Sequence, residues 1–147
     1  MKHLVLSALA LFVGALIPIQ AATNAAMAKV VGDFSIAALA LFLIGLATVS
    51  GWMLVTQPTL PSLSQLTDVP AYGYLGGVIV ASYVLAITYL APRMGVGNAI
   101  CFVVTGQIIA AVIIDHFGLF GANLTALNWQ RGAGIVLMIV GLFLAKR

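Results

Sequence analysis

The stretch Gly14–Ala25, GALIPIQAATNA, decides how this chain is to be interpreted. It lies within an apolar run long enough to cross a membrane, yet it contains Pro18, Gln20, Thr23 and Asn24. The last three are spaced i, i+3 and i+4, so a helix would place them on one face. Polar groups in hydrocarbon need hydrogen-bond partners. This polar face is therefore predicted to look inward, toward other helices or a water-filled cavity.

Two interpretations of the polar face stay open at the level of sequence. Membrane helices use Asn and Gln to hydrogen-bond to each other, so the face can be a helix–helix contact. It can also line the path of a substrate. Pro18 adds a local feature, because proline has no N–H and leaves the carbonyl of Gly14 without its helical partner. We expect a helix kink at Pro18.

The composition indicates an integral membrane protein. Of 147 residues, 63% are hydrophobic and 6% are charged, whereas a soluble domain carries about 25% charged residues. The net charge of +3 does not indicate nucleic-acid binding, because the basic residues are single and scattered among apolar segments. One cysteine, Cys101, excludes an intramolecular disulfide and a cysteine-based metal site.

Five apolar segments predict an all-α fold, a bundle of five transmembrane helices in a single domain, residues 1–147. The expected spans are about 3–28, 34–56, 71–90, 96–114 and 127–145. The first is a full span in length, so we expect it to be kept and not cleaved as a leader peptide. Asp33 is placed to cap the second span, and Pro70 lies where the first turn of the third tolerates proline.

The distribution of basic residues gives a weak orientation. With five spans, one side of the membrane holds Lys2 and Arg131, and the other holds Lys29, Arg93 and the C-terminal pair Lys146 and Arg147. The positive-inside rule therefore predicts a cytoplasmic C-terminus. The margin of 4 against 2 is thin, and it permits insertion in both orientations. A single fixed orientation fits the same count.

The groups that could contact a solute are neutral. Tyr83 and Gln107 are among those nearest the middle of their spans, Gln20 lies somewhat off centre, and Asn24 shares its helix face. Such side chains exchange hydrogen bonds without the desolvation cost of a charge. We predict that Gln20, Asn24, Tyr83 and Gln107 bind a neutral or weakly polar substrate.

Asp115 is the candidate for proton coupling, because it is one of three acids in the chain and carboxylates at the membrane often belong to proton relays. Its neighbour His116 points about 100° away on a helix, so the two do not readily serve one proton. We expect them to cap the end of the fourth span. No catalytic motif, metal-ligand cluster or phosphate loop is found in the sequence. We expect no enzymatic activity, catalytic residue, metal or cofactor.

Four segments together resemble a known family. They are GALIPIQAATNA, GGVIVASYVLAITYLAPRMG, VVTGQIIAAVIIDHFGLFG and RGAGIVLMIVGLFLAKR. The combination of Pro18, Gln20 and Asn24 with Tyr89-Leu90-x-Pro92-Arg93, Gly106-Gln107 and Asp115-His116-Phe117-Gly118 is similar to the YdcZ-type branch of the drug/metabolite transporter superfamily. The resemblance covers nearly the whole chain.

This resemblance implies a five-helix half of an inverted-repeat transporter, similar to one repeat of the longer EamA-type transporters. It implies a multi-pass protein of the bacterial inner membrane, surrounded by lipid. The partner would be a second, antiparallel copy or a paired paralogue, since two copies of opposite orientation restore an inverted repeat. The expected function is transport of a small metabolite or drug-like solute.

Two other functions are weighed against transport. The first is a structural or assembly subunit whose polar groups only hold helices together. The second is an intramembrane enzyme using Asp115 and His116, which is disfavoured because no second acid or metal site accompanies them.

Overall fold

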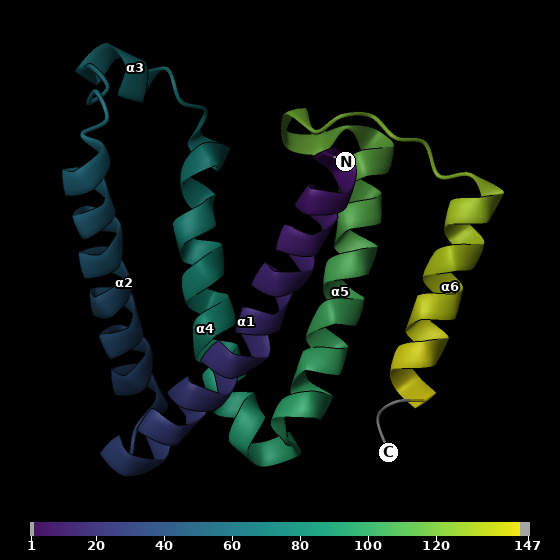
Figure 1. Cartoon of the computed structure of the whole chain (residues 1–147), viewed down its shortest axis with the longest axis horizontal. Coiled ribbons are helices and arrows are strands. Elements are labelled where there is room, and N and C mark those ends of the chain that lie inside the picture. The colour runs from purple at the N-terminus through teal and green to yellow at the C-terminus, as the bar shows by residue number, and fades with distance from the viewer. Residues whose placement is uncertain (1, 145–147) are drawn as a thin grey trace. The chain divides into compact units, whose positions relative to one another are not determined.

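The computed structural model describes residues 2–144, and this part of the chain is almost entirely helical. Five long helices follow one another: α1 (Lys2–Val31), α2 (Phe34–Thr56), α4 (Leu75–Met94), α5 (Val96–Phe117) and α6 (Trp129–Leu144). Three short ones connect them: α3 (Leu63–Thr67), η1 (Ala71–Tyr74) and η2 (Leu119–Gly121). Figure 1 shows the helices in chain order. The chain forms two compact units, the N-terminal unit Met1–Arg93 and the C-terminal unit Met94–Arg147.

The all-α membrane fold predicted from the sequence is confirmed. Among the described residues, four helical segments are long and apolar enough to cross a membrane: His3–Val31, Phe34–Thr56, Ala71–Met94 and Val96–Phe117. Large apolar side chains such as Leu11 and Leu54 are each 77% exposed. Water would oppose this exposure by about 25 cal/mol per Å² of apolar surface, whereas lipid tails do not.

The fifth helix is shorter than the span expected at 127–145. Helix α6 has 16 residues, or roughly 24 Å at 1.5 Å per residue, against roughly 30 Å of hydrocarbon. It begins at Trp129 because Asn128 caps it, with the Asn128 side-chain oxygen accepting from the Arg131 N–H at 2.8 Å. Residue 145 lies outside the described part of the chain, and so do Lys146 and Arg147. Whether the chain is one domain stays a prediction.

The turn between α1 and α2 follows from two residues. Gly32 has a φ of +84°, a left-handed conformation that glycine adopts without steric cost, and its N–H bonds to the Ala28 carbonyl at 2.9 Å. Asp33 then caps α2, as predicted: one carboxylate oxygen accepts from the Ser35 and Ile36 N–H groups at 2.7 and 3.0 Å. One helix thus ends and the next begins within two residues.

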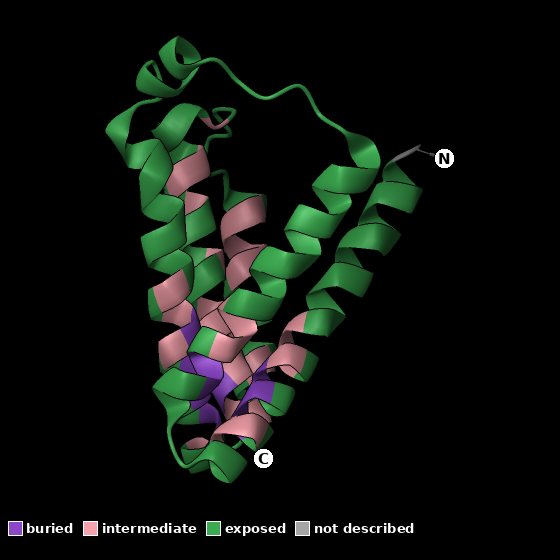
Figure 2. Cartoon of the chain, turned by 90° about the vertical axis from the view of Figure 1, so that its left-hand side faces the viewer, coloured by how far each residue is buried: buried purple, intermediate pink, exposed green. Residues whose placement is uncertain are grey.

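Small side chains form the core of the N-terminal unit. Ala21 and Ala25 of α1, Ala37 and Ala38 of α2 and Ala91 of α4 are all buried, with Val84, Ile87 and Thr88 beside them on α4. Figure 2 shows the buried residues gathered near one end of these helices. Small residues let helix backbones approach closely, which is how membrane helices gain van der Waals contact.

The link between α2 and α4 is held by its own side chains. Gln57, with a φ of 44°, ends α2 directly before Pro58. Ser62 and Gln65 form a capping box at the start of α3, and the Tyr74 hydroxyl donates to the Leu66 carbonyl at 2.8 Å. The link therefore satisfies part of its backbone without a sheet or a second domain.

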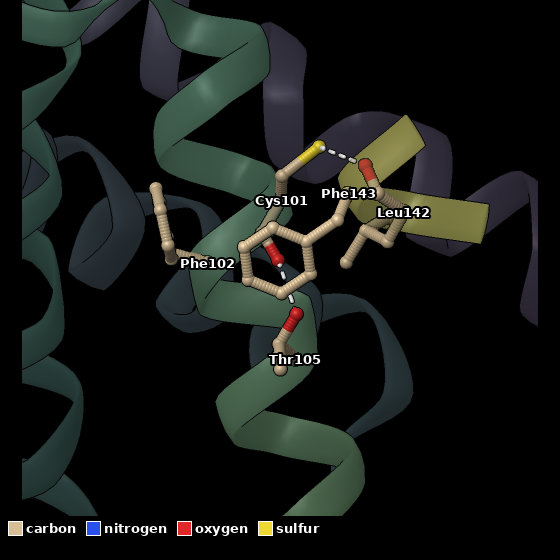
Figure 3. Close-up of a pocket in the computed structure, with 5 residues that line it drawn as sticks. All are labelled: Cys101, Phe102, Thr105, Leu142 and Phe143. Atoms are coloured by element: carbon tan, nitrogen blue, oxygen red, sulfur yellow. Dashed lines mark hydrogen bonds between the residues drawn. The ribbon is translucent and has the colours of Figure 1, made fainter. Parts of the chain in front are cut away.

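In the C-terminal unit, glycine marks both ends of α5. Gly95 precedes it with a φ of +87°, and Gly118 ends it with a φ of +61° while its N–H bonds to the Ile114 carbonyl. Toward the other end of α5 from Gly118, α5 and α6 touch through a few side chains (Figure 3): the Phe102 and Phe143 rings meet edge to face at 5.7 Å, and the Cys101 sulfur lies 3.8 Å from the Leu142 carbonyl oxygen. This contact leaves no room for a water molecule.

The Asp33 cap predicts a pH-dependent stability. The Ser35 hydroxyl and the Ile36 and Ser35 N–H groups donate to the Asp33 carboxylate and lower its pKa below the ordinary value of 3.8. A lowered pKa in the folded state adds stability above pH 3.8, which is lost as the pH falls through the folded pKa. The melting temperature of the wild type should therefore exceed that of Asp33→Ala at neutral pH, and the gap should shrink in acid.

Circular dichroism of the detergent-solubilised proteins measures this gap. Asp33→Asn is the matched control, because asparagine caps helices without a charge. At neutral pH its melting temperature should fall less than that of Asp33→Ala. The pH dependence that comes from the Asp33 carboxylate should be absent from it. A gap between wild type and Asp33→Ala that stays constant from neutral to acid pH contradicts the prediction.

Candidate functional site

The three polar residues on the polar face of α1 lie in three different environments. Thr23 is exposed, and its hydroxyl donates to the Gln20 carbonyl of its own helix at 3.0 Å. Asn24 is buried, with 4% of its surface exposed. Gln20 is half-buried, and helix α1 runs through Pro18 without interruption. Of the three predicted polar residues, Asn24 is therefore the one that points fully into the protein, and the kink at Pro18 stays a prediction.

Asn24 connects α1 to α4 through a buried hydrogen bond. Its side-chain nitrogen donates to the Thr88 hydroxyl, and that hydroxyl donates in turn to the Val84 carbonyl at 2.7 Å. Thr88 is 1% exposed. The chain Asn24–Thr88–Val84 gives the Asn24 amide nitrogen and the Thr88 hydroxyl each an acceptor inside the bundle, which an apolar solvent does not supply.

Two other polar atoms of the N-terminal unit are buried without a partner. They are the side-chain nitrogen of Gln20 and the hydroxyl of Tyr83, neither of which has a hydrogen bond among the described residues. Helices α1 and α4 run in the same direction (Figure 1) and are joined at Asn24 and Thr88. About one turn back along each helix lie Gln20 and Tyr83, so these two residues stand at similar depth.

A small groove opens beside Asn24 between α1 and α2. It has a volume of about 170 Å³ and is lined by Thr23, Asn24, Met27, Leu41 and Ile44. The groove is mostly apolar with one amide at its wall, a lining typical of sites for weakly polar molecules.

The remaining predicted residues lie in the C-terminal unit. Gln107 is an exposed residue of α5, and Asp115 lies in the last turn of the same helix, where it is half-buried. The structure thus brings Asn24 together with Thr88, and it places Gln107 and Asp115 on a different unit from Gln20, Asn24 and Tyr83.

Asp115 takes part in a set of contacts that ties α5 to the start of α6. Its carboxylate pairs with the Arg131 guanidinium, whose other nitrogen donates to the Thr125 carbonyl at 3.0 Å. The Asp115 carbonyl accepts from the Thr125 N–H at 2.8 Å, and the His116 ring nitrogen Nδ1 accepts from the Leu127 N–H at 3.1 Å. These bonds fix Thr125 and Leu127 in a connection without helical structure, which explains why α6 does not begin near Leu127.

One expectation about this region is wrong. The C-cap of α5 is Gly118, whereas Asp115 and His116 contact the following connection and do not cap the helix. Arg131, near the start of α6, folds back onto Asp115. The ion pair offsets the cost of placing either charge near the end of an apolar span. Proton coupling through Asp115 stays a prediction.

Thr88 is the residue that sequence reasoning missed. Its hydroxyl shares a helix with Ser82 and Tyr83, but threonine in a helix usually bonds to its own i−4 carbonyl, which Thr88 also does. The sequence offered one indication that Thr88 has such a role: it lies four residues before Pro92, within one helical turn of the small residue Ala91. Only the packing of α4 against α1 shows that the hydroxyl accepts from Asn24.

The described residues hold no group of three or more His, Cys, Asp or Glu side chains that could bind a metal ion. The buried polar residues, Asn24 and Thr88, carry instead a neutral amide and a hydroxyl.

The fold and these polar groups define a small helical membrane protein with hydrogen-bonding side chains between its helices. Residues 5–144 match the model of the family described as "Putative inner membrane exporter, YdcZ". The chain belongs to this family, as its resemblance to YdcZ-type proteins indicated, and it is a membrane protein of the transporter type. Comparison with curated proteins gave no match, and comparison with solved structures gave none either.

The buried bond between Asn24 and Thr88 can be tested by a double-mutant cycle. Thr88→Val keeps the shape of the side chain but leaves the Asn24 amide without an acceptor. We expect a loss of about 1–2 kcal/mol in the free energy of unfolding in detergent micelles. Adding Asn24→Leu should cost less than the sum of the two single changes, because no buried polar group is then left unpaired.

The matched control for this cycle is Thr48→Val on α2. The Thr48 hydroxyl is exposed and donates to the Ile44 carbonyl of its own helix at 2.8 Å, so its loss should stay within about 0.5 kcal/mol. Equal effects of the two Thr→Val changes, or strictly additive energies at Asn24 and Thr88, contradict the assignment.

Proposed function

We propose that the protein is a small secondary transporter that exports a small metabolite or drug-like solute by alternating access, as one half of an antiparallel dimer. Its family of inner membrane exporters supports the transport function. The observation that carries the site is the pair of buried, unpartnered polar atoms on Gln20 and Tyr83.

The Gln20 nitrogen and the Tyr83 hydroxyl are important because hydrocarbon offers them no hydrogen bond. A buried amide or hydroxyl without a hydrogen bond costs about 1–3 kcal/mol in proteins. An apolar residue at either position would avoid that cost. A polar solute that bonds to both groups would satisfy them, and this is a reason for a transporter to keep them.

The proposed binding residues are Gln20, Asn24 and Tyr83 of the N-terminal unit and Gln107 of the C-terminal unit. None carries a formal charge, so the site suits a neutral or weakly polar solute. The face of the Tyr83 ring could also attract a delocalised cation. Thr88 acts as a positioning residue in this proposal, because it holds the Asn24 side chain.

The proposed partner is a second copy of the chain in the opposite orientation, or a paired paralogue. Five helices and a thin excess of basic residues on one side favour this arrangement, since two antiparallel copies form an inverted repeat. Alternating access would then be the rocking of one protomer against the other around a site near the middle of the membrane.

Asp115 is the proposed proton-coupling residue. Its carboxylate is held by Arg131, so proton uptake would require this ion pair to open during the cycle. Such opening would also free the extended connection between α5 and α6, which the same pair secures through Thr125.

Apolar replacements at the unpartnered atoms separate transport from stability. Tyr83→Phe and Gln20→Leu should leave the melting temperature unchanged or raise it, because each removes an unsatisfied buried group. The same variants should lower efflux of an exported compound by about two- to tenfold, since one lost hydrogen bond to a neutral substrate is worth about 0.5–1.5 kcal/mol. Efflux from cells loaded with a panel of fluorescent compounds measures this.

Ser82→Ala is the matched control, because Ser82 is an exposed neighbour whose hydroxyl bonds to the Val78 carbonyl of its own helix at 2.9 Å. Its efflux should equal that of the wild type. Variants at Gln20 and Tyr83 that export as well as Ser82→Ala remove these residues from the site. Absence of efflux for every compound, together with fixed-ratio copurification with a larger complex, favours a structural subunit.

The antiparallel arrangement predicts that the chain inserts both ways. Reporters active only in the periplasm or only in the cytoplasm, fused separately after Arg147, should both give strong signals. A fusion that carries Lys29→Gln reduces the bias from 4 against 2 to 3 against 2 and should shift the ratio toward the periplasmic reporter. A signal from the cytoplasmic reporter alone, in both versions, rules out an antiparallel homodimer and directs the search to an oppositely oriented paralogue.

A further inference from the structure

We propose that a polar cleft at the α1–α2 turn binds a phosphate-type anion. The cleft has a volume of about 210 Å³. The last turn of α1, the Gly32–Asp33 turn and the last turns of α4 form its wall, and Lys29, Asp33 and Arg93 supply its charges. Two of the six basic residues in the chain therefore line one cleft. This inference is independent of the transport function.

The acidic residue of the cleft is already engaged. Asp33 directs one carboxylate oxygen at the N-terminus of α2, where it accepts from the Ser35 N–H, the Ser35 hydroxyl and the Ile36 N–H at 2.7, 2.7 and 3.0 Å. These three donors offset its charge. Lys29 and Arg93 face the cleft without an acid pairing of that kind in the structure, and the only ion pair in the described residues joins Arg131 to Asp115.

Helix dipoles do not reverse this balance. The C-termini of α1 and α4 each contribute about half a negative charge, and the N-terminus of α2 contributes about half a positive charge. Lys29 and Arg93 lie in the last turns of α1 and α4. Their two positive charges exceed the sum of the Asp33 charge and the partial charges of the helix ends. The cleft is therefore net positive.

Arg93 is held in place before any ligand arrives. One guanidinium nitrogen donates to the Tyr89 carbonyl at 2.7 Å, and the guanidinium carbon lies 3.5 Å over the Tyr89 ring. The Tyr89 ring meets Phe34 edge to face at 5.4 Å. The bond to Tyr89 uses one of the five N–H donors of arginine, and the planar group suits the paired oxygens of a phosphate.

The size and the depth of the cleft match a headgroup-sized anion. Its volume is below the roughly 300–1,000 Å³ of sites for drug-sized molecules. It also lies at the ends of helices that are long enough to cross the membrane, where phospholipid phosphates are found. Basic pockets between membrane helices at this depth bind anionic headgroups. The phosphate of an anionic lipid and a soluble phosphate share this chemistry.

Binding is measured with two probes on the full-length protein. Inorganic phosphate is titrated calorimetrically into protein in a neutral detergent. Phosphatidylglycerol retention is followed by native mass spectrometry after extraction from nanodiscs that mix it with phosphatidylcholine. Lys29→Gln combined with Arg93→Gln should weaken binding of at least one probe tenfold or more, since hydrogen bonds between charged groups are the strong ones.

Two further variants make the result specific. Lys2→Gln removes the same charge from the other end of α1 and should bind as the wild type does. Arg93→Lys keeps the charge but loses the planar guanidinium, so it should bind with intermediate affinity. This variant also tests the site if the double variant does not fold.

Each outcome of these measurements either supports the anion site or overturns it. Phosphate binding in detergent that the double variant loses supports a site open to soluble anions, and selective phosphatidylglycerol retention that it loses supports a lipid headgroup. Equal binding by wild type and double variant overturns the site, as does an equal loss in Lys2→Gln, which would show attraction to net charge alone.

Discussion

The arrangement of the N-terminal unit depends on one buried hydrogen bond, from the Asn24 amide to the Thr88 hydroxyl. In lipid, apolar surfaces gain little by leaving solvent, so helices associate through close packing and through polar groups that need each other. Alanines supply the close packing around this bond. The bond also fixes which residue of α4 faces Asn24, because the amide donates to the Thr88 hydroxyl.

The polar groups of the molecule fall into three kinds by what satisfies them. Some are satisfied within the bundle, as Asn24 is, and these hold helices together. Others bond to their own helix, as the hydroxyls of Thr23 and Ser82 do. The side-chain nitrogen of Gln20 and the Tyr83 hydroxyl have no hydrogen-bond partner within residues 2–144. A protein that only needed to hold its helices together would not require this last kind, and so these groups are the basis of the proposed transport site.

Local features of the chain were readable from residue types alone. The Asp33 cap follows from the affinity of a carboxylate for free helix N–H groups, and the sequence pattern at residues 32–33 indicates it without reference to any other helix. The start of α6 was predicted too early, because the bonds that fix Leu127 and Thr125 outside the helix come from His116 and Asp115 on a different helix. Sequence spacing does not show contacts of that kind.

The sequence by itself determined the membrane environment, the number of long helices and the family, because hydropathy, length and motif order are properties of the linear chain. It also indicated that one face of α1 is polar. Tertiary structure decided which of those polar side chains forms a contact. The Thr88 hydroxyl accepts from Asn24, while the side-chain nitrogen of Gln20 has no partner among the residues that the structure describes. The physical reason is that a hydrogen bond has two partners, and the second partner is 64 residues away in sequence.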